Sequence, residues 1–157
     1  MKFLNLINKN LFFHELTHFI LSLLSGLFVW LIFRDWRLLP VAILFGFFID
    51  VDHLFDYLNW SRGSLKLSEF FTPRLYVRGS KKVFVPLHGW EFLPFVWIFG
   101  RIIGLKIGIS GFQWAASLAY FTHMSWDQIT VNPNTLGYFF IYRLINNFKM
   151  KSFNGKK

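Results

Sequence analysis

Long apolar runs separated by short polar segments dominate the pattern of the chain. The first run, 19–33, follows a mixed lead-in and ends at the polar turn 34–37. Because a helix needs about 20 apolar residues to cross a membrane, such runs predict membrane spans rather than the core of a soluble domain. We expect four spans and one short helix lying at the membrane surface. The predicted spans are 12–33, 38–55, 89–109 and 110–127, and the predicted surface helix is 136–147.

The second apolar run, 38–49, is too short to cross the hydrocarbon by itself. The helix is therefore expected to continue into the stretch 50–56, which holds three aspartates and one histidine. That continuation would bring ionisable groups below the lipid surface, where they are costly and usually functional. The alternative is a polar loop that leaves the membrane, with Asp50 and Asp52 as turn formers.

The segment 58–87 differs in character from the apolar runs. Basic side chains alternate there with Ser, Gly, Pro and aromatic residues, which is typical of a loop at the membrane surface. Turns are expected at 62–64 and 78–80, and either a short strand or an extended piece at 82–85. A basic tail, 148–157, follows the predicted surface helix.

The composition supports a membrane protein. Of the 157 residues, 54% are hydrophobic and 22% are aromatic, which is well above the apolar share of a soluble domain. The predicted fold class is all-α, a polytopic membrane protein with a single membrane-embedded domain over 1–157. The chain has no cysteine, which excludes disulfides and thiolate metal sites.

The net charge of +9 is explained better by a membrane than by a nucleic acid. The basic residues lie mostly between or after the apolar runs, where they would face anionic lipid head groups. We therefore expect membrane lipids as partners and no direct binding of nucleic acid. No cleavable signal is expected in the first residues.

The positive-inside rule orients the four predicted spans. With both termini in the cytoplasm, Lys2, Lys9, the basic residues of 58–87, Arg143 and the lysines of the tail all face inward. Most of the 17 basic residues are then cytoplasmic. This arrangement predicts a multi-pass protein of the cell's inner membrane.

The same topology gathers the residues that carry chemistry at the cytoplasmic ends of the spans. All five histidines fall there, together with six of the eight acidic residues. Carboxylates that are buried together repel one another unless a cation compensates their charge. The acidic residues expected at this rim are Glu15, Asp50, Asp52, Asp56, Glu91 and Asp127.

The stretch 14–18 has the form H-E-x-x-H. His14 and His18 lie four residues apart on one helix face, the spacing with which two imidazoles can hold one ion. In a zinc protease, Glu15 of such a motif would be the general base. The motif is short, and a pair of histidines at the membrane surface is the alternative.

Two other pairs have a similar spacing. His123 and Asp127 are four residues apart and Asp50 and His53 are three apart, so each pair shares a face of a continuous helix. Nitrogen and oxygen donors of this kind suit Zn²⁺, and Mn²⁺ or Fe also bind mixed sites. We expect two or three ions, held by His14, His18, Asp50, Asp52, His53, His88, His123 and Asp127.

Further candidates accompany these ligands. Glu15, Asp56 and Glu91 are the candidate catalytic bases, and His14 is a candidate for a supporting role as well as for a ligand. Basic side chains of 58–87 would meet a substrate phosphate or acidic lipid, and the alternative is a solvated basic loop that serves only the topology. The phosphate-binding candidates are Arg74, Arg78, Lys81 and Lys82.

These motifs resemble those of bacterial and archaeal inner-membrane metal-dependent hydrolases that are often described as LexA-binding. That family is distantly similar to zinc-dependent phospholipase C and to single-strand nucleases, which use H-x-x-x-D and H-x-x-x-E pairs around three zinc ions. His123 and Asp127 match the first pair, whereas His88 and Glu91 are one residue closer than the second. The likeness covers most of the chain and is carried by Thr17-His18, Asp50-Val51-Asp52-His53, His88-Gly89, and His123-Met124-Ser125-Trp126-Asp127 followed by Pro133.

The sequence thus predicts a membrane-bound, metal-dependent hydrolase whose metal cluster lies at the cytoplasmic face of the membrane. Paired ions suit the hydrolysis of a phosphoester, and the resemblance implies a phospholipid or another phosphoester as substrate. Two alternatives stay open. One is an H-E-x-x-H zinc protease that needs Glu15 and one ion, and the other is a metal-binding, transport or adaptor protein without catalysis.

Overall fold

The computed structural model describes residues 11–155, except for the side chains of Leu11, Phe12, Pro73, Arg74 and Arg78. Helices account for 74% of the residues, and the described part of the chain contains no β-strand. The all-α prediction is therefore confirmed.

Contacts within the chain divide it into two compact units. The first unit combines the described residues up to Ile49 with Glu91–Val131, and the second combines Asp50–Trp90 with the described residues from Asn132 onward. Each unit is thus assembled from two stretches that are distant in sequence. The single domain predicted over 1–157 stays a prediction.

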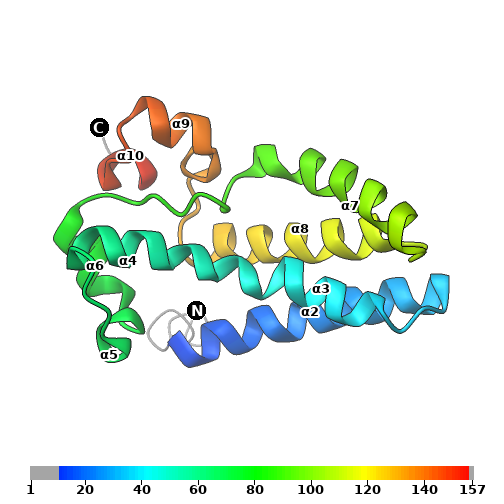
Figure 1. Ribbon diagram of the computed structural model, residues 1–157. Helices are drawn as coiled ribbons and strands as arrows, with labels where there is room; N and C mark the ends of the chain where they lie inside the picture. Colours follow the sequence, from blue (N-terminus) through cyan, green and yellow to red (C-terminus); the bar gives the residue numbers. More distant parts are fainter. Residues whose placement is uncertain (1–10, 156–157) are drawn as a thin grey trace. The chain divides into compact units, whose positions relative to one another are not determined.

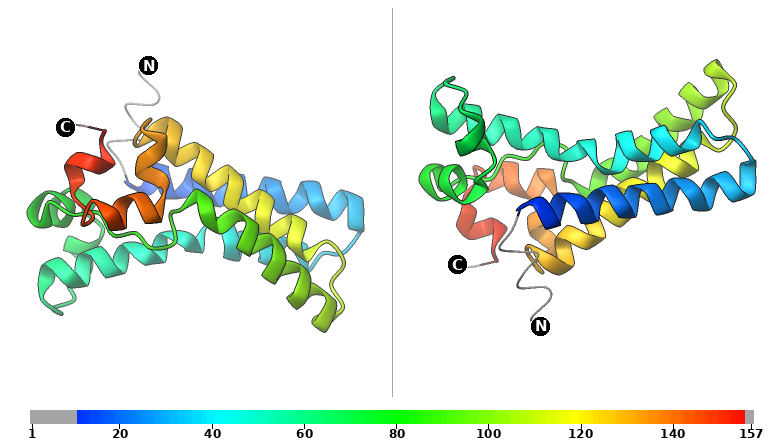
Figure 2. Two further views of the ribbon diagram at one scale, coloured as in Figure 1. Left: turned by 90° about the horizontal axis from the view of Figure 1, so that it is seen from above. Right: turned by 90° about the horizontal axis from the view of Figure 1, so that it is seen from below.

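The first unit is a bundle of long helices (Figure 1). Helix α8 packs against α2, α3 and α7, and the two views of Figure 2 show α8 running alongside α2 and α7. Its α-helices are α2 (Leu11–Phe33), α3 (Leu38–Gly46), α7 (Leu93–Ile107) and α8 (Phe112–Thr130).

Small residues on α8 allow the helices of the first unit to approach closely. Ala115, Ala116 and Ala119 are fully buried and pack in one cluster with Val41 and Ala42 of α3. Small side chains at helix contacts are typical of bundles in membranes, where packing rather than water exclusion holds helices together.

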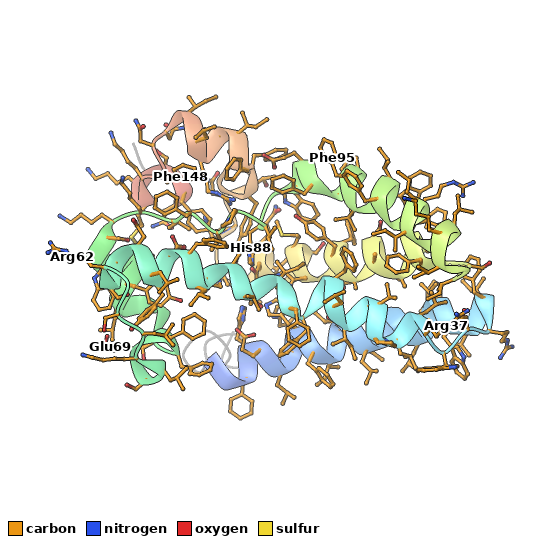
Figure 3. The ribbon with its side chains drawn as sticks, viewed as in Figure 1. Arg37, Arg62, Glu69, His88, Phe95 and Phe148 are labelled. Atoms are coloured by element: carbon orange, nitrogen blue, oxygen red, sulfur yellow. The ribbon has the colours of Figure 1, made fainter. Side chains whose placement is uncertain are left out.

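The outer faces of these helices are apolar. On α2, Leu24, Phe28 and Ile32 are 55%, 58% and 62% exposed, and on α7 Leu105 is 72% exposed. Large contiguous apolar surfaces are rare on soluble monomers and mark contacts with a membrane or a partner. Figure 3 shows Phe95 on this exterior of α7.

One described helix is long and apolar enough to cross a membrane. It is α2, over Phe13–Phe33, with a mean hydropathy of 2.1. A second span is available only if α3 and the following helical stretch Phe48–Ser61 form one broken span. Helix α7 has 15 residues, fewer than the about 20 that a straight span needs.

The polar turn predicted between the first two apolar runs is confirmed. Arg34 adopts a left-handed conformation with φ of 56°, and the turn closes with hydrogen bonds from Leu38 N to Asp35 O and from Leu39 N to Trp36 O. Asp35 accepts two-pronged hydrogen bonds from the Arg37 guanidinium, at 2.7 Å for Nη2 to Oδ2, at the turn marked by Arg37 in Figure 3. These bonds hold the pKa of Asp35 below its usual value.

The second unit consists of shorter helices joined by extended segments. The 3₁₀ turn η1 (Phe48–Asp52) leads into it, and an isolated antiparallel bridge between Lys82 and Lys149 joins its two stretches of sequence. Its helices are α4 (His53–Ser61), α5 (Leu67–Phe70), α6 (Pro73–Ser80), η3 (Thr135–Tyr138), α9 (Phe140–Ile145) and α10 (Met150–Phe153).

Several local predictions differ from the structure in the second unit. The turn expected at 78–80 is wrong, because α6 continues to Ser80 and ends at Lys81, which has a positive φ of 55°. The turn at 62–64 is confirmed, with Arg62 and Gly63 both at positive φ. The single surface helix expected over 136–147 is instead divided into η3 and α9, with Phe139 extended between them.

Candidate metal-binding clusters

Each unit contains a cluster of histidine and aspartate side chains. We name the group His14, His18, His123 and Asp127 the α2–α8 cluster, after the two helices of the first unit that carry it. We name the group Asp50, Asp52, His53 and His88 the α4–turn cluster, because its members come from η1, the start of α4 and the turn before Trp90 in the second unit.

The α2–α8 cluster follows directly from helical spacing. His14 and His18 are one turn apart on α2, and His123 and Asp127 are one turn apart on α8. His18 is 0% exposed, and its ring stacks on that of His123 with centroids 3.9 Å apart. The two predicted pairs of ligands therefore meet within one unit.

Three ligand atoms of this cluster form a small triangle. The Nε2 atoms of His14 and His18 lie 3.0 Å apart. Asp127 Oδ1 lies 3.3 Å from Nε2 of His14 and 3.0 Å from Nε2 of His18. All three atoms therefore lie within 3.3 Å of one another.

The same triangle can hold protons or an ion. An imidazole nitrogen carries either a hydrogen or a lone pair. When each Nε2 carries a hydrogen, both imidazoles can donate to Asp127 Oδ1. When both Nε2 atoms carry lone pairs, the three atoms together offer three ligands to one cation.

The size of the triangle also fits a metal ion. Ligands of a tetrahedral Zn²⁺ ion at bonds of about 2.0 Å are separated by about 3.3 Å. The sides of the triangle are 3.0, 3.0 and 3.3 Å. His14, His18 and Asp127 therefore fit three of four positions of a tetrahedral site, the number that catalytic zinc sites take from the protein.

His123 is prepared as a ligand by the backbone of α3. Its Nδ1 lies 2.6 Å from the carbonyl oxygen of Gly46, and because a carbonyl can only accept, Nδ1 must donate its hydrogen. Nε2 of the neutral ring then carries the lone pair, and it lies 3.6 Å from Asp127 Oδ2. Such a bond from the second ring nitrogen is the usual way in which a protein orients a histidine ligand.

Glycine at position 46 is required by close packing. A Cβ atom there would overlap Ser22 Oγ and lie 3.0 Å from the Cβ of Ala119. Ser22 in turn donates to the carbonyl of His18 at 2.7 Å. The absence of a side chain at Gly46 therefore lets α3 come near enough to offer its carbonyl to His123.

Asp127 presents its two oxygens to different imidazoles. Oδ1 faces His14 and His18, whereas Oδ2 faces His123. A carboxylate used in this way is suited to bridge two ions. The cluster thus has the donor set for one ion and part of the donor set for a second.

The α4–turn cluster is built around Asp50. Its Oδ1 lies 3.2 Å from Nε2 of His88 and 3.6 Å from Nε2 of His53. Asp50 and His53 have the predicted i, i+3 relation across the junction of η1 and α4. His88, labelled in Figure 3, comes from the extended segment that follows α6 and is 2% exposed.

Asp52 orients His88. Its Oδ2 accepts a hydrogen bond from Leu87 N at 2.7 Å and lies 3.0 Å from Nδ1 of His88, so Nδ1 donates and Nε2 of the neutral ring carries the lone pair. In that state the Nε2 lone pair and Asp50 Oδ1, 3.2 Å apart, can bind one cation together, whereas a protonated ring would donate to Asp50. Carboxylate–histidine–metal arrangements have this form.

Buried polar atoms without a hydrogen-bond partner mark the same cluster. Among the described residues, Asp52 Oδ1, His53 Nδ1 and Asp56 Oδ2 are buried and have none. Leaving a buried polar atom unsatisfied costs about 1–3 kcal/mol. Asp52, His53 and His88 each offer one ligand atom within 4.8 Å of the others, so an ion would recover part of this cost.

The predicted catalytic bases take different positions. Asp56 is buried and accepts a hydrogen bond from Phe84 N at 2.7 Å, so it holds the segment that leads to His88. Glu15 lies on α2 between the two histidines of its motif, and Glu91 lies in η2 (Trp90–Phe92) before α7. Neither glutamate belongs to a group of three or more possible ligands within the described residues.

The predicted phosphate-binding residues lie at the end of α6 and beyond it. Lys81 and Lys82 are exposed, and the Lys82 ammonium lies 5.8 Å from the centre of the Phe84 ring. The side chains of Arg74 and Arg78 are outside the described part of the structure, although their backbone belongs to α6.

Arg143, one of the basic residues expected on the cytoplasmic side, is buried, with a side chain that is 1% exposed. The side of the membrane on which it lies stays a prediction. Three backbone carbonyls accept hydrogen bonds from its guanidinium: those of Val85, His88 and Gly137. These acceptors compensate the burial of the charged group. The sequence offered no signal for this role.

No family of known proteins, no curated protein and no solved structure matches the chain.

Proposed function

We propose that the protein is a membrane-bound, metal-dependent hydrolase of phosphoesters, including those of phospholipids. The observation that carries the proposal is Asp127, whose two oxygens face separate imidazoles while one of them completes a triangle of metal-ligand size with His14 and His18. The resemblance of the His and Asp motifs to inner-membrane hydrolases supports the same class of reaction.

The proposed location is the inner membrane, crossed several times, with both termini in the cytoplasm. The exposed apolar side chains of α2 and α7 support it, as does the hydropathy of Phe13–Phe33. The four predicted spans and the meeting of all five histidines at one rim are part of this proposal.

The residues of the two clusters have distinct proposed roles. His14, His18 and Asp127 hold one ion, with Asp127 extending toward His123. Asp50, His53 and His88 hold a further ion, with Asp52 orienting His88. Bound divalent ions, with Zn²⁺ as first choice and Mn²⁺ or Fe as others, would polarise the phosphoryl group and stabilise its developing negative charge.

A zinc protease is the second candidate, and one observation favours it. The Nε2 atoms of the H-E-x-x-H motif do converge, and Asp127 supplies a third ligand. Two histidines and one acid are the ligand set of several zinc proteases. Asp127 is a ligand in both candidates, so substitution of Asp127 does not separate them.

The deciding experiment combines metal analysis with two variants of the full chain purified in detergent. A phosphoesterase should contain more than one ion per chain and cleave a fluorescent phospholipid or a nitrophenyl phosphodiester. Asp50→Asn should then reduce turnover about 100-fold or more, because one donor set is lost, whereas Glu15→Gln should retain most activity.

The reverse pattern identifies the protease. It would show one ion per chain, cleavage of a peptide library, and loss of activity in Glu15→Gln but not in Asp50→Asn. Asp35→Asn, at the far end of α2, is the matched control in both assays. Metal binding without cleavage of either substrate class would contradict a hydrolase and favour a metal-binding or adaptor protein.

A further inference from the structure

We infer that Arg143 is a positioning residue that holds His88 in the orientation needed to bind an ion. This inference rests on the proposed function only in taking His88 as a metal ligand. Arg143 lies on α9, 55 residues after His88, and its Nη1 donates to the His88 carbonyl at 2.7 Å. The same nitrogen donates to the carbonyl of Gly137 at 3.0 Å, and Nη2 donates to that of Val85 at 2.9 Å.

The turn that Arg143 contacts needs external support. Val85 has a positive φ of 28°, a conformation that costs a β-branched residue strain and persists only where surrounding contacts impose it. The Val85 carbonyl accepts hydrogen bonds both from His88 N, at 3.0 Å, and from Arg143. Arg143 therefore stabilises the turn at two residues: Val85, which is strained, and His88, which is the proposed metal ligand.

His88 is held at three polar groups from three directions. Its N–H donates to Val85 O, its carbonyl accepts from Arg143, and its Nδ1 donates to Asp52. With the backbone and Nδ1 fixed, Nε2 remains directed at Asp50 Oδ1 at 3.2 Å. Asp52 sets the rotation of the ring, and Arg143 sets the position of the backbone that carries it.

Arginine suits this position better than lysine. The planar guanidinium presents several N–H groups in fixed directions, whereas an ammonium is a point charge on a flexible stem. A lysine at 143 could therefore keep the positive charge and one hydrogen bond, but it could not bridge Val85, His88 and Gly137. The Arg143→Lys substitution therefore keeps the positive charge but removes the bridging of the three carbonyls.

The test measures Zn²⁺ affinity at the α4–turn cluster alone. The parent is full-length Asp127→Ala in detergent, which lacks both of the oxygens that face the imidazoles of the α2–α8 cluster. Zn²⁺ affinity is measured by competition with a chromophoric chelator, and Co²⁺ absorption in the visible range reports the coordination of the ion. Arg143→Met and Arg143→Lys are introduced in this parent, with Tyr57→Phe as the control.

Tyr57 is a suitable control because it is a fully buried residue of the same unit with its own hydrogen bond. Its hydroxyl accepts from Lys66 N at 2.9 Å, at the start of α5. Loss of that bond should weaken the unit in general. It should not alter the Co²⁺ spectrum.

We expect Arg143→Met and Arg143→Lys to weaken Zn²⁺ binding about 10–100-fold, the usual effect of losing a group that orients a metal ligand. The Co²⁺ bands should change in both, and Tyr57→Phe should leave them unchanged. When His88 is replaced by Ala in the same parent, Arg143→Lys should cause no further loss, because the group it positions is gone.

Three results would overturn the inference or its basis. Unchanged Zn²⁺ affinity in folded Arg143→Lys would overturn the positioning role alone. An equal loss with and without His88 would show that Arg143 acts through the general stability of the unit, which also overturns it. Absence of any bound ion in the unsubstituted protein would instead overturn the proposed function. If Arg143→Met does not fold, Arg143→Lys decides.

Discussion

The two clusters contain the same kinds of ligand but are assembled differently. In the α2–α8 cluster, four ligands sit on two long helices at intervals of one turn. In the α4–turn cluster, Asp50 and His53 lie at a helix junction, and His88 comes from a turn that Asp52 and Arg143 hold in place. The first arrangement is fixed by helix geometry, and the second by tertiary hydrogen bonds.

The difference indicates where each cluster is vulnerable. Helices keep their side chains in register even when one contact is lost, so the α2–α8 cluster should fail mainly when a ligand is removed. A turn with a strained residue depends on its surroundings. Metal binding at the α4–turn cluster should therefore also be weakened by substitution of residues that are not metal ligands.

The largest expected effect is that of Asp127→Ala. The substitution removes the oxygen shared by His14 and His18 and the oxygen that faces His123. We expect Zn²⁺ affinity at the α2–α8 cluster to fall by at least about 100-fold, since each ligand carries several kcal/mol of the binding free energy. Competition titration measures this, and an affinity that stays within threefold would contradict the triangle as a metal site.

Gly46→Ala should be the most damaging substitution that removes no ligand from the α2–α8 cluster. The new Cβ would overlap Ser22 Oγ and crowd Ala119, and overpacking of this kind costs about 1–3 kcal/mol. Thermal unfolding in detergent should show the loss. The double variant Ser22→Ala/Gly46→Ala removes the nearest atom and should recover part of the stability, and no recovery would place the cause elsewhere.

Asp52→Asn should weaken the α4–turn cluster and leave the other cluster unchanged. The asparagine side chain lacks the negative charge that holds the Nδ1–H group of His88 as a hydrogen-bond donor. We therefore expect Zn²⁺ to bind about 10–100-fold more weakly at the α4–turn cluster. Asp56→Asn is the matched control, because its amide oxygen can still accept from Phe84 N. If the two substitutions weaken Zn²⁺ binding equally, Asp52 has no specific role in orienting His88.

The smallest effect should come from Asp35→Asn, which breaks an ion pair in the turn after α2 and removes no residue of either cluster. The pKa of Asp35 is lowered by Arg37 from its ordinary value of 3.8, so the pair stabilises the fold above that pH and the contribution disappears as the pH falls through the lowered pKa. The variant should unfold at a slightly lower temperature at pH 7 and at the same temperature as the parent at strongly acidic pH. Its metal content should not change.

The residues predicted from the sequence are those governed by local spacing. His14 with His18, and His123 with Asp127, could be paired because one helical turn separates them, and Asp50 with His53 for the same reason. The polar turn around Asp35 was also predictable, since a charged stretch between two apolar runs must leave the helix.

The remaining features depend on contacts that the spacing of residues does not encode. Arg143 entered the sequence analysis only as one of the basic residues that orient the chain, because two of its three carbonyl acceptors lie 55 and 58 residues away. Gly46 gave no sign that its carbonyl orients His123. The helical state of 78–80 was missed because Arg-Gly-Ser favours turns locally, whereas the structure keeps those residues in α6.

The clamp formed by Arg143 has a consequence for the order in which the protein is made. The ribosome completes Asp50, Asp52, His53 and His88 well before it adds Arg143, which contacts His88 from 55 residues further along. A nascent chain therefore carries the donors of the α4–turn cluster before it carries the group that positions His88. Tight ion loading at that cluster should accordingly be a late event in biogenesis, and chains interrupted before position 143 should emerge with their ligands but with a weakened site.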